Sequence, residues 1–405
     1  MHCHPSLRLS TGLITLAAVL LQACGGSGGD STTPAATAGV LAVATAPTLA
    51  DKVAVGDKLF DEVRLSAGGN LACGTCHEAT RGHADAEGVF LPLGGPRLDQ
   101  QGLRSTPTAN YLNDTTAFRL PRQGAPQGGF TWDGRADSRT VQALAPLLAA
   151  NEMANSNAAE VVGRVRALPY FGELAFAYSL SNNASDTQVL QALQQALADY
   201  QQGDIGYQPY TSKFDAVLEG RATLTAQEDR GRNIFSSPQR GNCASCHSIA
   251  PLPGSTKPLF TNFEFHALGV PRNTSTATAD PNFFDMGLCG PVRTDLANRT
   301  DLCGLFKVPT LRNVALTAPY FHNGAVATLE QAVDFYATRD TDPARWYPTQ
   351  NGVVVKFNDL PAAYRGNVNQ QAPFGQLAGQ PRRLSVQDVQ DVVAFLRTLT
   401  DGFTP

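Results

Sequence analysis

The sequence predicts a mainly α-helical protein of two related domains, in which short helices are joined by long ordered loops. The chain has 405 residues, enough for two ordinary domains with packed cores. Glycine (37) and proline (26) are plentiful, and the interior holds long stretches without sharp apolar periodicity. Similar short segments recur in the two halves of the chain. The net charge is −4, with 31 basic and 35 acidic residues, which gives no electrostatic reason to expect a nucleic-acid partner.

The N-terminus predicts export. Arg8 precedes an apolar stretch, Leu13–Leu21, that is too short to span a bilayer. The following Gln22-Ala23-Cys24 resembles a bacterial lipoprotein cleavage site, so we expect residues 1–23 to be a signal peptide and Cys24 to carry lipid. An ordinary cleaved signal with an incidental cysteine is the alternative. Residues 24–50, rich in Gly, Ser, Thr and Ala, then form a flexible tether. This arrangement predicts a globular body on the periplasmic side of a bacterial membrane, held there by a lipid anchor.

The two halves of the chain show the same order of elements. A Gly-x-x-x-Phe segment comes first, in Gly56–Phe60 and again in Gly231–Phe235. Each half ends in a stretch with apolar residues at helical spacing, which predicts helices at 189–200 and 386–399. We therefore expect an N-terminal domain at 51–220 and a C-terminal domain at 221–405.

A Cys-x-x-Cys-His motif follows the Gly-x-x-x-Phe segment in each half. The residues are Cys73, Cys76 and His77, and then Cys243, Cys246 and His247. This spacing lets both thiols add to the vinyl groups of one haem, and the adjacent histidine then binds the iron. A zinc site built from the four cysteines is the alternative, but zinc does not require a histidine directly after both pairs. The motifs predict two covalently bound haems c in two cytochrome c-like domains, each wrapped by a helix before the motif and a helix at the end.

Two cysteines remain, Cys289 and Cys303, because Cys3 leaves with the signal and Cys24 takes the lipid. They flank one loop in a compartment that permits disulfides, so we expect them to pair.

Two haems alone would equally suit a non-enzymatic electron carrier. An iron that is capped on both faces transfers electrons, whereas an iron with one open face binds peroxide. The distinction therefore depends on the second axial position of each haem.

Three further stretches carry a resemblance to a known family. The first contains Trp132-Asp133-Gly134-Arg135, followed by Pro146 and Glu152-Met153. The others are KVPTLRN at 307–313 and TAPYFHNG at 317–324. Together with the two haem motifs in this order, residues 50–402 resemble the bacterial dihaem cytochrome c peroxidases and their relative MauG. MauG makes a tryptophan-derived cofactor in another protein.

The resemblance implies that the N-terminal haem is the peroxide site and that Glu152 overhangs its open face. Such a carboxylate takes a proton from the bound peroxide and returns it to the departing oxygen. Gln142 and Pro146 stand at the family's spacing before Glu152. The alternative is a surface glutamate at the end of a helix.

Many peroxidases of this family cap the resting N-terminal haem with a histidine that moves aside on activation. The matching position here holds Arg97. The alternative cap is His83, six residues after His77, but its surroundings are typical of an exposed turn. We therefore expect an open N-terminal haem that needs no reductive activation.

At the C-terminal haem the resemblance points to Tyr336. The dihaem peroxidases usually place a methionine there as the distal iron ligand, whereas MauG has a tyrosine. A phenolate donates charge to the iron and lowers its potential. A core aromatic is the alternative role for Tyr336, and Met286 is the rival ligand.

Trp132 matches the tryptophan that lies between the two haems in this family, where an indole relays electrons. A large core aromatic is its alternative role. The only other tryptophan is Trp346. The surface tryptophan that MauG places just before its second haem motif has no match, because Arg240-Gly241-Asn242 stand there. This difference argues against MauG's own protein substrate.

The family also holds a calcium ion between the haems. Thr317 and Pro319 match its carbonyl ligands, and Ser105 stands where an asparagine ligand is expected. A hydroxyl and waters can substitute for that side chain. We expect His266 and His322 to support the sites or the core and not to bind iron.

The sequence thus favours an oxidoreductase that uses hydrogen peroxide at the N-terminal haem. It would oxidise either a small cytochrome c or cupredoxin donor, or a residue of a partner protein. A non-enzymatic dihaem electron carrier is the alternative.

Overall fold

The computed structural model describes residues 46–85, 91–274 and 282–404. The predicted signal peptide (1–23), Cys24 and most of the predicted tether (24–50) lie outside these ranges. No helix within them combines the length and apolar character needed to span a bilayer.

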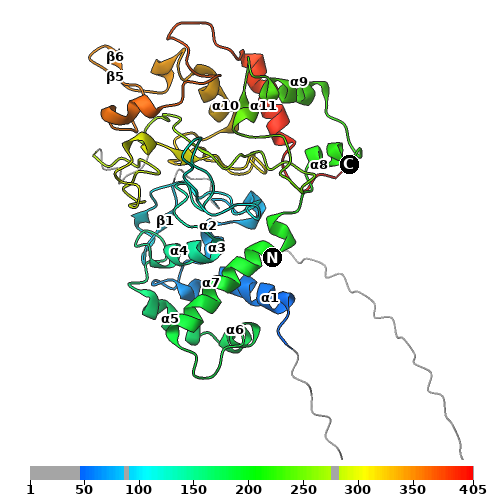
Figure 1. The fold of residues 1–405 in the computed structure, drawn as a ribbon, viewed down its shortest axis with the longest axis vertical. Coiled ribbons are helices and arrows are strands. Elements are labelled where there is room, and N and C mark those ends of the chain that lie inside the picture. The colour runs from blue at the N-terminus through cyan, green and yellow to red at the C-terminus, as the bar shows by residue number, and fades with distance from the viewer. Residues whose placement is uncertain (1–45, 86–90, 275–281, 405) are drawn as a thin grey trace, which may run out of the picture. The chain divides into compact units, whose positions relative to one another are not determined.

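The fold is mainly α-helical with a few very short strands, as the sequence predicts (Figure 1). The α-helices are α1 (Leu49–Phe60), α2 (Cys73–Cys76), α3 (Arg139–Gln142), α4 (Leu144–Leu148), α5 (Ala158–Arg166), α6 (Phe171–Ala177), α7 (Asp186–Gly203), α8 (Lys213–Leu218), α9 (Ala226–Ser236), α10 (Leu329–Thr338) and α11 (Val386–Arg397). The strands form antiparallel pairs of two residues each: β1 (Leu93–Gly94) with β2 (Gln100–Gln101), β3 (Phe265–His266) with β4 (Phe306–Lys307), and β5 (Thr349–Gln350) with β6 (Val353–Val354). Long loops connect these elements.

The two predicted terminal helices are confirmed. The stretch 189–200 lies within α7, and 386–399 corresponds to α11. Helix α7 begins before the apolar pattern because Ser185 caps it. The Ser185 hydroxyl accepts a hydrogen bond from the Gln188 N–H, and the Gln188 side chain accepts one from the Ser185 N–H. The cap satisfies backbone donors that an uncapped helix end would leave unpaired.

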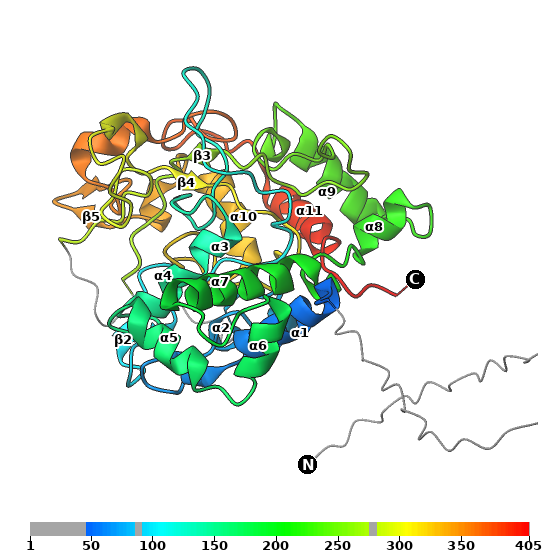
Figure 2. The same ribbon diagram turned by 60° about the horizontal axis from the view of Figure 1, so that its bottom comes forward.

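The repeated Gly-x-x-x-Phe segments lie at helix crossings. Helix α1 packs on α7, and α9 packs on α11 (Figures 1 and 2). At the first crossing, a Cβ on Gly56 would lie 2.3 Å from the carbonyl oxygen of Ala196. At the second, a Cβ on Gly231 would lie 1.9 Å from the carbonyl oxygen of Asp391. Only glycine allows the helix backbones to approach this closely, so the repeat in the sequence corresponds to the same packing contact in both halves.

Two large apolar clusters follow the same division of the chain. The first draws on buried residues between 55 and 207, and the second on buried residues between 214 and 399. Phe214 of α8 belongs to the second cluster, where its ring meets those of Phe260 and Phe395 at 5.5 and 5.6 Å. The first apolar cluster therefore ends at Tyr207 and the second begins at Phe214, close to the predicted domain boundary at 220. The division into two domains itself stays a prediction.

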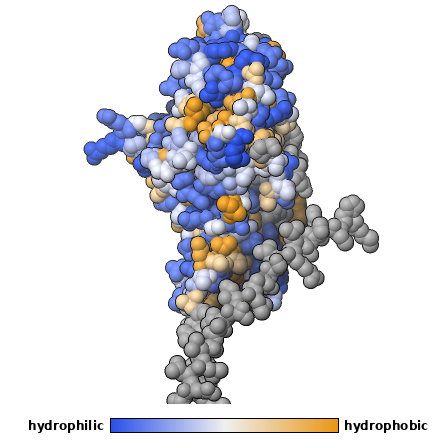
Figure 3. All heavy atoms as spheres, turned by 90° about the vertical axis from the view of Figure 1, so that its right-hand side faces the viewer, coloured by the Kyte–Doolittle hydropathy of each residue, from blue (hydrophilic) through white to orange (hydrophobic). Residues whose placement is uncertain are grey.

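Loops from the two halves are joined by backbone hydrogen bonds. The Ser105 N–H donates to the His322 carbonyl at 2.8 Å, and the Lys307 N–H donates to the Trp132 carbonyl at 2.9 Å. The Gly128 N–H donates to the Phe263 carbonyl at 3.0 Å. These bonds satisfy loop backbone that neither half pairs internally. In Figure 3 the face shown is mostly hydrophilic, and its apolar residues form small separate patches.

Candidate active site and cofactor motifs

The first Cys-x-x-Cys-His motif forms the short helix α2. The Thr75 hydroxyl accepts a hydrogen bond from the Ala72 N–H at 3.0 Å, and the His77 N–H donates to the Cys73 carbonyl at 2.9 Å. The second motif contains a 3-10 turn, Cys243–Ser245, and the His247 N–H likewise donates to the Cys243 carbonyl at 2.8 Å. None of the four motif cysteines forms a disulfide. Both motifs therefore hold two thiols and a histidine on one tight turn.

The two motif histidines are oriented in the same way. His77 Nδ1 lies 2.8 Å from the His83 carbonyl oxygen, and His247 Nδ1 lies 3.0 Å from the Phe260 carbonyl oxygen. A carbonyl accepts only from a protonated nitrogen, so Nε2 keeps its lone pair for a metal. Burial lowers the pKa of His77 and lowers that of His247 to about 4. Both rings are therefore neutral imidazoles, the form that binds iron.

A large cavity of about 1840 Å³, its mouth included, opens beside the second motif. Cys243, Cys246 and His247 line it, and Trp132 and Tyr336 lie in its wall. Much of the remaining wall is apolar, with contributions from Val308, Leu311, Val333, Leu384, Val392 and Leu396. An apolar space with two thiols and a neutral imidazole in its wall fits a covalently attached haem.

Tyr336 lies on α10 in the wall of this cavity. Its ring stacks on Phe374 at 5.3 Å, and no hydrogen bond to its hydroxyl is present among the described residues. Burial raises the pKa of the Tyr336 phenol, and so do Cys246 and Cys243, while Arg339 acts in the opposite direction. A phenolate at this position would therefore need a positive charge in the cavity, which a bound iron would supply. Met286, the rival ligand, does not line the cavity.

Glu152 lies in a turn that the β1–β2 hairpin holds in place. Its N–H donates to the Ala149 carbonyl at 2.9 Å, and its own carbonyl accepts from the Gly95 N–H at 2.8 Å. Any side chain at Gly94 would collide with this turn, because a Cβ there would lie 2.2 Å from the Asn151 carbonyl oxygen. The backbone around Glu152 is thus fixed from two sides.

The Glu152 side chain is exposed to solvent on one side, while neighbouring protein atoms remove much of the water around its carboxyl group. Burial raises the pKa of its carboxyl group, and the charge of Arg135 partly offsets that effect. The Glu152 charge is also one of the causes that raise the pKa of Cys73. Glu152 is therefore electrostatically coupled to the first haem motif, and its pKa lies closer to neutrality than that of an ordinary glutamate.

Gln142 and Pro146 lead into the Glu152 turn. Gln142 ends α3, where its N–H donates to the Ser138 carbonyl at 2.9 Å and its side chain is half-buried. Pro146 belongs to α4, and its carbonyl accepts from the Met153 N–H at 3.1 Å. Pro146 therefore connects α4 directly to the residue after Glu152.

His83, the alternative cap of the N-terminal haem, and Arg97, which stands at the family's capping position, lie in different places. His83 is buried and not on an exposed turn, contrary to the expectation from the sequence. Its ring stacks on Tyr207 at 4.0 Å, its Nδ1 lies 2.6 Å from Asn110 Oδ1, and its carbonyl holds His77. His83 therefore lies on the His77 side of the motif and not opposite it. Arg97 lies in the loop of the β1–β2 hairpin, where it is exposed and pairs with Asp99.

Trp132 is held at both ends. Its indole N–H donates to the Ser105 carbonyl at 2.8 Å, and its backbone carbonyl accepts from Lys307. Next to it the Asp133 carboxylate is fully buried and pairs with Arg104 at 2.8 Å and Arg135 at 2.9 Å. Trp132 is therefore a fixed ring between the first-half loops and the cavity of the second half.

The predicted calcium ligands Ser105, Thr317 and Pro319 all line this cavity. The buried Ser105 hydroxyl donates to the Pro319 carbonyl at 3.3 Å. Among the described residues, no group of three or more His, Cys, Asp or Glu side chains could hold a metal ion. His322 stacks on Phe306 at 3.5 Å, and His266 lies 3.3 Å from Glu264.

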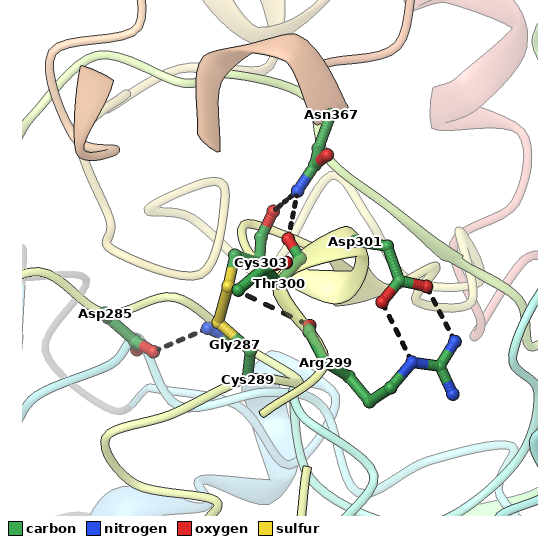
Figure 4. The surroundings of a disulfide bond; sticks show 8 residues. All are labelled: Asp285, Gly287, Cys289, Arg299, Thr300, Asp301, Cys303 and Asn367. Atoms are coloured by element: carbon green, nitrogen blue, oxygen red, sulfur yellow. Dashed lines mark hydrogen bonds and ion pairs between the residues drawn. A yellow bond between two sulfur atoms is a disulfide. The ribbon is translucent and has the colours of Figure 1, made fainter. Parts of the chain in front are cut away.

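The predicted disulfide between Cys289 and Cys303 is confirmed (Figure 4). The Asn367 amide donates to the carbonyls of Thr300 and Cys303, at 2.8 and 3.0 Å. At the start of the same loop, Asp285 pairs with Arg104 at 2.6 Å. Arg104 thereby joins the disulfide loop to Asp133, a link that no motif in the sequence indicates.

Comparisons with known proteins agree with this architecture. A family model described as di-haem cytochrome c peroxidase matches residues 50–223. The methylamine utilization protein MauG of Paracoccus denitrificans is 32% identical over 371 residues, which cover 86% of this chain and 88% of MauG. Cytochrome c551 peroxidase of Nitrosomonas europaea is 31% identical, with 74% of this chain and 79% of the relative covered. Among solved structures, the diheme peroxidase BthA from Burkholderia thailandensis superposes with a TM-score of 0.78 at 36% identity, covering 88% of this chain and 87% of BthA.

The fold, the two motifs and these relatives all lead to one conclusion. The chain belongs to the dihaem cytochrome c peroxidase and MauG family and is a peroxidase enzyme that holds two haems c.

Proposed function

We propose that this enzyme reduces hydrogen peroxide at the N-terminal haem, which Cys73, Cys76 and His77 hold, with Glu152 as the group that moves the proton. The observation that carries the proposal is the fixed turn at Glu152, where the Gly95 N–H donates to the Glu152 carbonyl at 2.8 Å and the carboxylate stands near enough to Cys73 to make a small contribution to its pKa. When bound, the haem supplies an iron that takes peroxide as a ligand and accepts its oxidising equivalents.

Glu152 performs the acid–base part of this chemistry. Its carboxylate would accept a proton from one oxygen of peroxide and return it to the other oxygen, which would leave as water. A raised pKa suits both steps, because a group that titrates closer to neutrality gives and takes a proton with a smaller penalty. The charge of Arg135 acts in the opposite direction and so limits the rise of the Glu152 pKa.

The His77 and His247 rings have a supporting part. Each donates from Nδ1 to a backbone carbonyl, which fixes the ring and makes Nε2 a stronger donor toward a metal. Trp132 offers an oxidisable indole in the cavity wall, and its N–H stays bonded to Ser105, so it can give up an electron without having to lose its proton.

Tyr336 supports the proposal that the second haem differs from that of the usual dihaem peroxidases. Its free hydroxyl lies in the same cavity as His247, whereas Met286 lies outside the cavity wall. A phenolate ligand lowers the potential of a haem iron and favours its oxidised states. This observation favours a second candidate activity, the oxidation of a residue of a partner protein, beside the oxidation of a small cytochrome c or cupredoxin.

The remaining expectations complete the proposal. Periplasmic location with a lipid anchor at Cys24 rests on the sequence of the N-terminus. A calcium ion near Ser105, Thr317 and Pro319 rests on their shared place in the cavity wall and on the oxygen atoms that they offer. Membership of a peroxidase family counts against the non-enzymatic electron carrier.

The decisive test compares Glu152→Gln with wild-type holoprotein in stopped-flow reactions with stoichiometric hydrogen peroxide. We expect the variant to keep both haems, by haem stain and reduced spectrum, and to react about 10²–10⁴-fold more slowly because the proton carrier is lost. Glu160→Gln is the matched control, since Glu160 pairs with Arg164 on the surface of α5. Equal rates for Glu152→Gln and wild type would show that another group moves the proton.

The same reaction separates the two candidate activities. A doubly oxidised state that persists without a donor indicates oxidation of a partner residue. Rapid decay that consumes a reduced small cytochrome indicates a cytochrome peroxidase.

A further inference from the structure

Trp346 lies outside the sites described so far. It follows the 3-10 turn Pro343–Arg345, and it is partly exposed to solvent. Its indole packs against two apolar clusters of the C-terminal half, the large one described above and a smaller one that includes Phe335 and Phe374. The chain has only two tryptophans, and the other, Trp132, lies in the wall of the C-terminal cavity.

One aromatic ring separates Trp346 from that cavity. The fully buried ring of Phe335 lies 5.4 Å from the Trp346 ring and 6.0 Å from the Tyr336 ring, measured between centroids. The Phe335 ring also meets Phe321 at 5.0 Å and Phe374 at 6.4 Å, and both of these residues line the cavity. Phe335 therefore contacts the aromatic cavity wall on one side and a partly exposed indole on the other.

The indole of Trp346 is held in one orientation. Its N–H donates to the Thr338 hydroxyl at 2.9 Å, and that hydroxyl donates to the Asp334 carbonyl at 2.6 Å. A hydroxyl is a poor base, so the indole proton stays in place when an electron leaves the ring. The ring can thus be oxidised and reduced with little rearrangement.

The surroundings of the indole carry a positive charge. The Arg345 guanidinium lies 5.4 Å from the Trp346 ring centroid. Arg345 and Arg382 share one carboxylate, that of Asp334, at 2.6 and 3.7 Å. Both arginines are partly exposed whereas Asp334 is buried, so an approaching anion meets the two guanidinium groups, which the exposed Asp342 at the start of the same turn only partly offsets.

We propose that Trp346 is the point at which an external one-electron donor with an anionic face delivers electrons to the C-terminal haem site. The inference rests on the proposed function, which supplies hydrogen peroxide as the oxidant. One electron passes from the Trp346 indole toward the Tyr336 side of the cavity, no bond breaks, and the indole keeps its proton. The donor then returns one electron to the indole. Two such transfers and two protons from solvent reduce one peroxide to two waters, and two donor molecules are oxidised.

The test uses holoprotein with the anionic one-electron donor ABTS. We expect Trp346→Phe to react with peroxide at the wild-type rate, measured by haem absorbance, and to oxidise ABTS about tenfold more slowly, equivalent to about 1.4 kcal/mol of barrier. Trp346→Tyr should recover much of the rate, because a phenol is oxidisable and a phenyl ring is not. Tyr178→Phe is the control, since Tyr178 belongs to the cluster of the N-terminal half.

A second readout does not depend on turnover. Without a donor, peroxide should generate an indole-centred radical signal in the electron spin-resonance spectrum of wild type, and that signal should be weaker in Trp346→Phe. Raising the ionic strength should slow ABTS oxidation by wild type more than by the Arg345→Gln variant, because the rim charge attracts the anion.

The outcomes separate the inference from the proposed function. If wild type does not react with peroxide, both are overturned. If wild type reacts and Trp346→Phe oxidises ABTS at an unchanged rate with an unchanged radical signal, the entry point at Trp346 is overturned and the proposed function stands. Variants with altered haem absorption or melting temperature before peroxide is added would place Trp346 in the folding of the site, which also overturns its role as an entry point.

Discussion

The two haem motifs are held alike on the histidine side and differ on the opposite side. Both histidines donate from Nδ1 to a backbone carbonyl, and burial lowers the pKa of both. Beyond that shared arrangement, the first motif is coupled to an acidic side chain, Glu152, on a clamped turn. The second faces a wall of aromatic rings that includes Tyr336.

This difference separates two groups of residues, those that recur in both halves and those that occur in only one. The repeated residues, from the crossing glycines to the motif histidines, fix where a haem is attached. In the proposed function, the residues that are not repeated set the chemistry on the other face of each haem, because a carboxylate moves protons and a phenol or ring system tunes electron transfer. We propose that the functional contrast between the two sites depends on a few side chains that lie outside the repeated segments.

The largest expected effect comes from replacing Tyr336, the residue that distinguishes the second site from the first. Tyr336→Phe should convert the C-terminal haem to a form with one open axial position, since the phenyl ring that replaces the phenol has no ligand atom. We expect the low-spin signal of that haem to disappear from the low-temperature spin-resonance spectrum, while the signal of the N-terminal haem is unchanged. Tyr336→Met should instead restore a methionine–ferric band in the near infrared and raise the midpoint potential. An unaltered low-spin signal in Tyr336→Phe would assign the ligand elsewhere.

A smaller effect is expected from replacing Arg104, which joins Asp133 in the N-terminal half to Asp285 beside the disulfide loop. Arg104→Met leaves the carboxylates of Asp133 and Asp285 buried without their shared partner. Breaking a buried ion pair in this way costs about 3–5 kcal/mol. Urea unfolding of the holoprotein should show this loss.

The control for Arg104 lies in the disulfide loop. Arg299 and Asp301 form an exposed pair there (Figure 4), and Arg299→Met should cost no more than about 1 kcal/mol. Similar losses for the two variants would mean that the buried network does not join the regions energetically.

The smallest expected effect is a pH dependence confined to the first site. The pKa of Glu152 is raised above its ordinary value of 4.5 because burial disfavours the ionised form. The carboxylate is the form that accepts the peroxide proton, so the bimolecular rate constant should fall as the pH drops through this raised pKa. Folding stability has the opposite trend, since a raised carboxyl pKa favours the folded protein more at low pH than at high pH. Glu152→Gln should lack both dependences, in pH-jump stopped flow and in melting curves.

The sequence predicts the residues that attach each haem, the cysteines and the histidine of the motif, better than the residues on the other face of the haem. Cys73, His77 and their counterparts form a local motif, and α7 and α11 follow from apolar spacing, because these features depend on neighbours along the chain. The disulfide between Cys289 and Cys303 follows from counting cysteines. Such signals need no knowledge of the tertiary fold.

The rest depends on contacts between distant segments. Arg104 reaches Asp285 across 181 positions of the chain, and no periodicity marks either residue. The burial of His83 follows from its stack on Tyr207 and its bond to Asn110, and neither partner is near it in the sequence. For the same reason the sequence names Trp346 but cannot show that Phe335 connects it to the cavity.

The crossing glycines have a consequence for how the protein is assembled. Helix α1 meets its partner α7 within the first 203 residues, so the N-terminal half can close around its own motif without waiting for the other. Helix α9 can pack on its partner α11 only after the chain has been made as far as Arg397, where α11 ends. We therefore expect the first site to be enclosed by α1 and α7 before α11 is available to close the second.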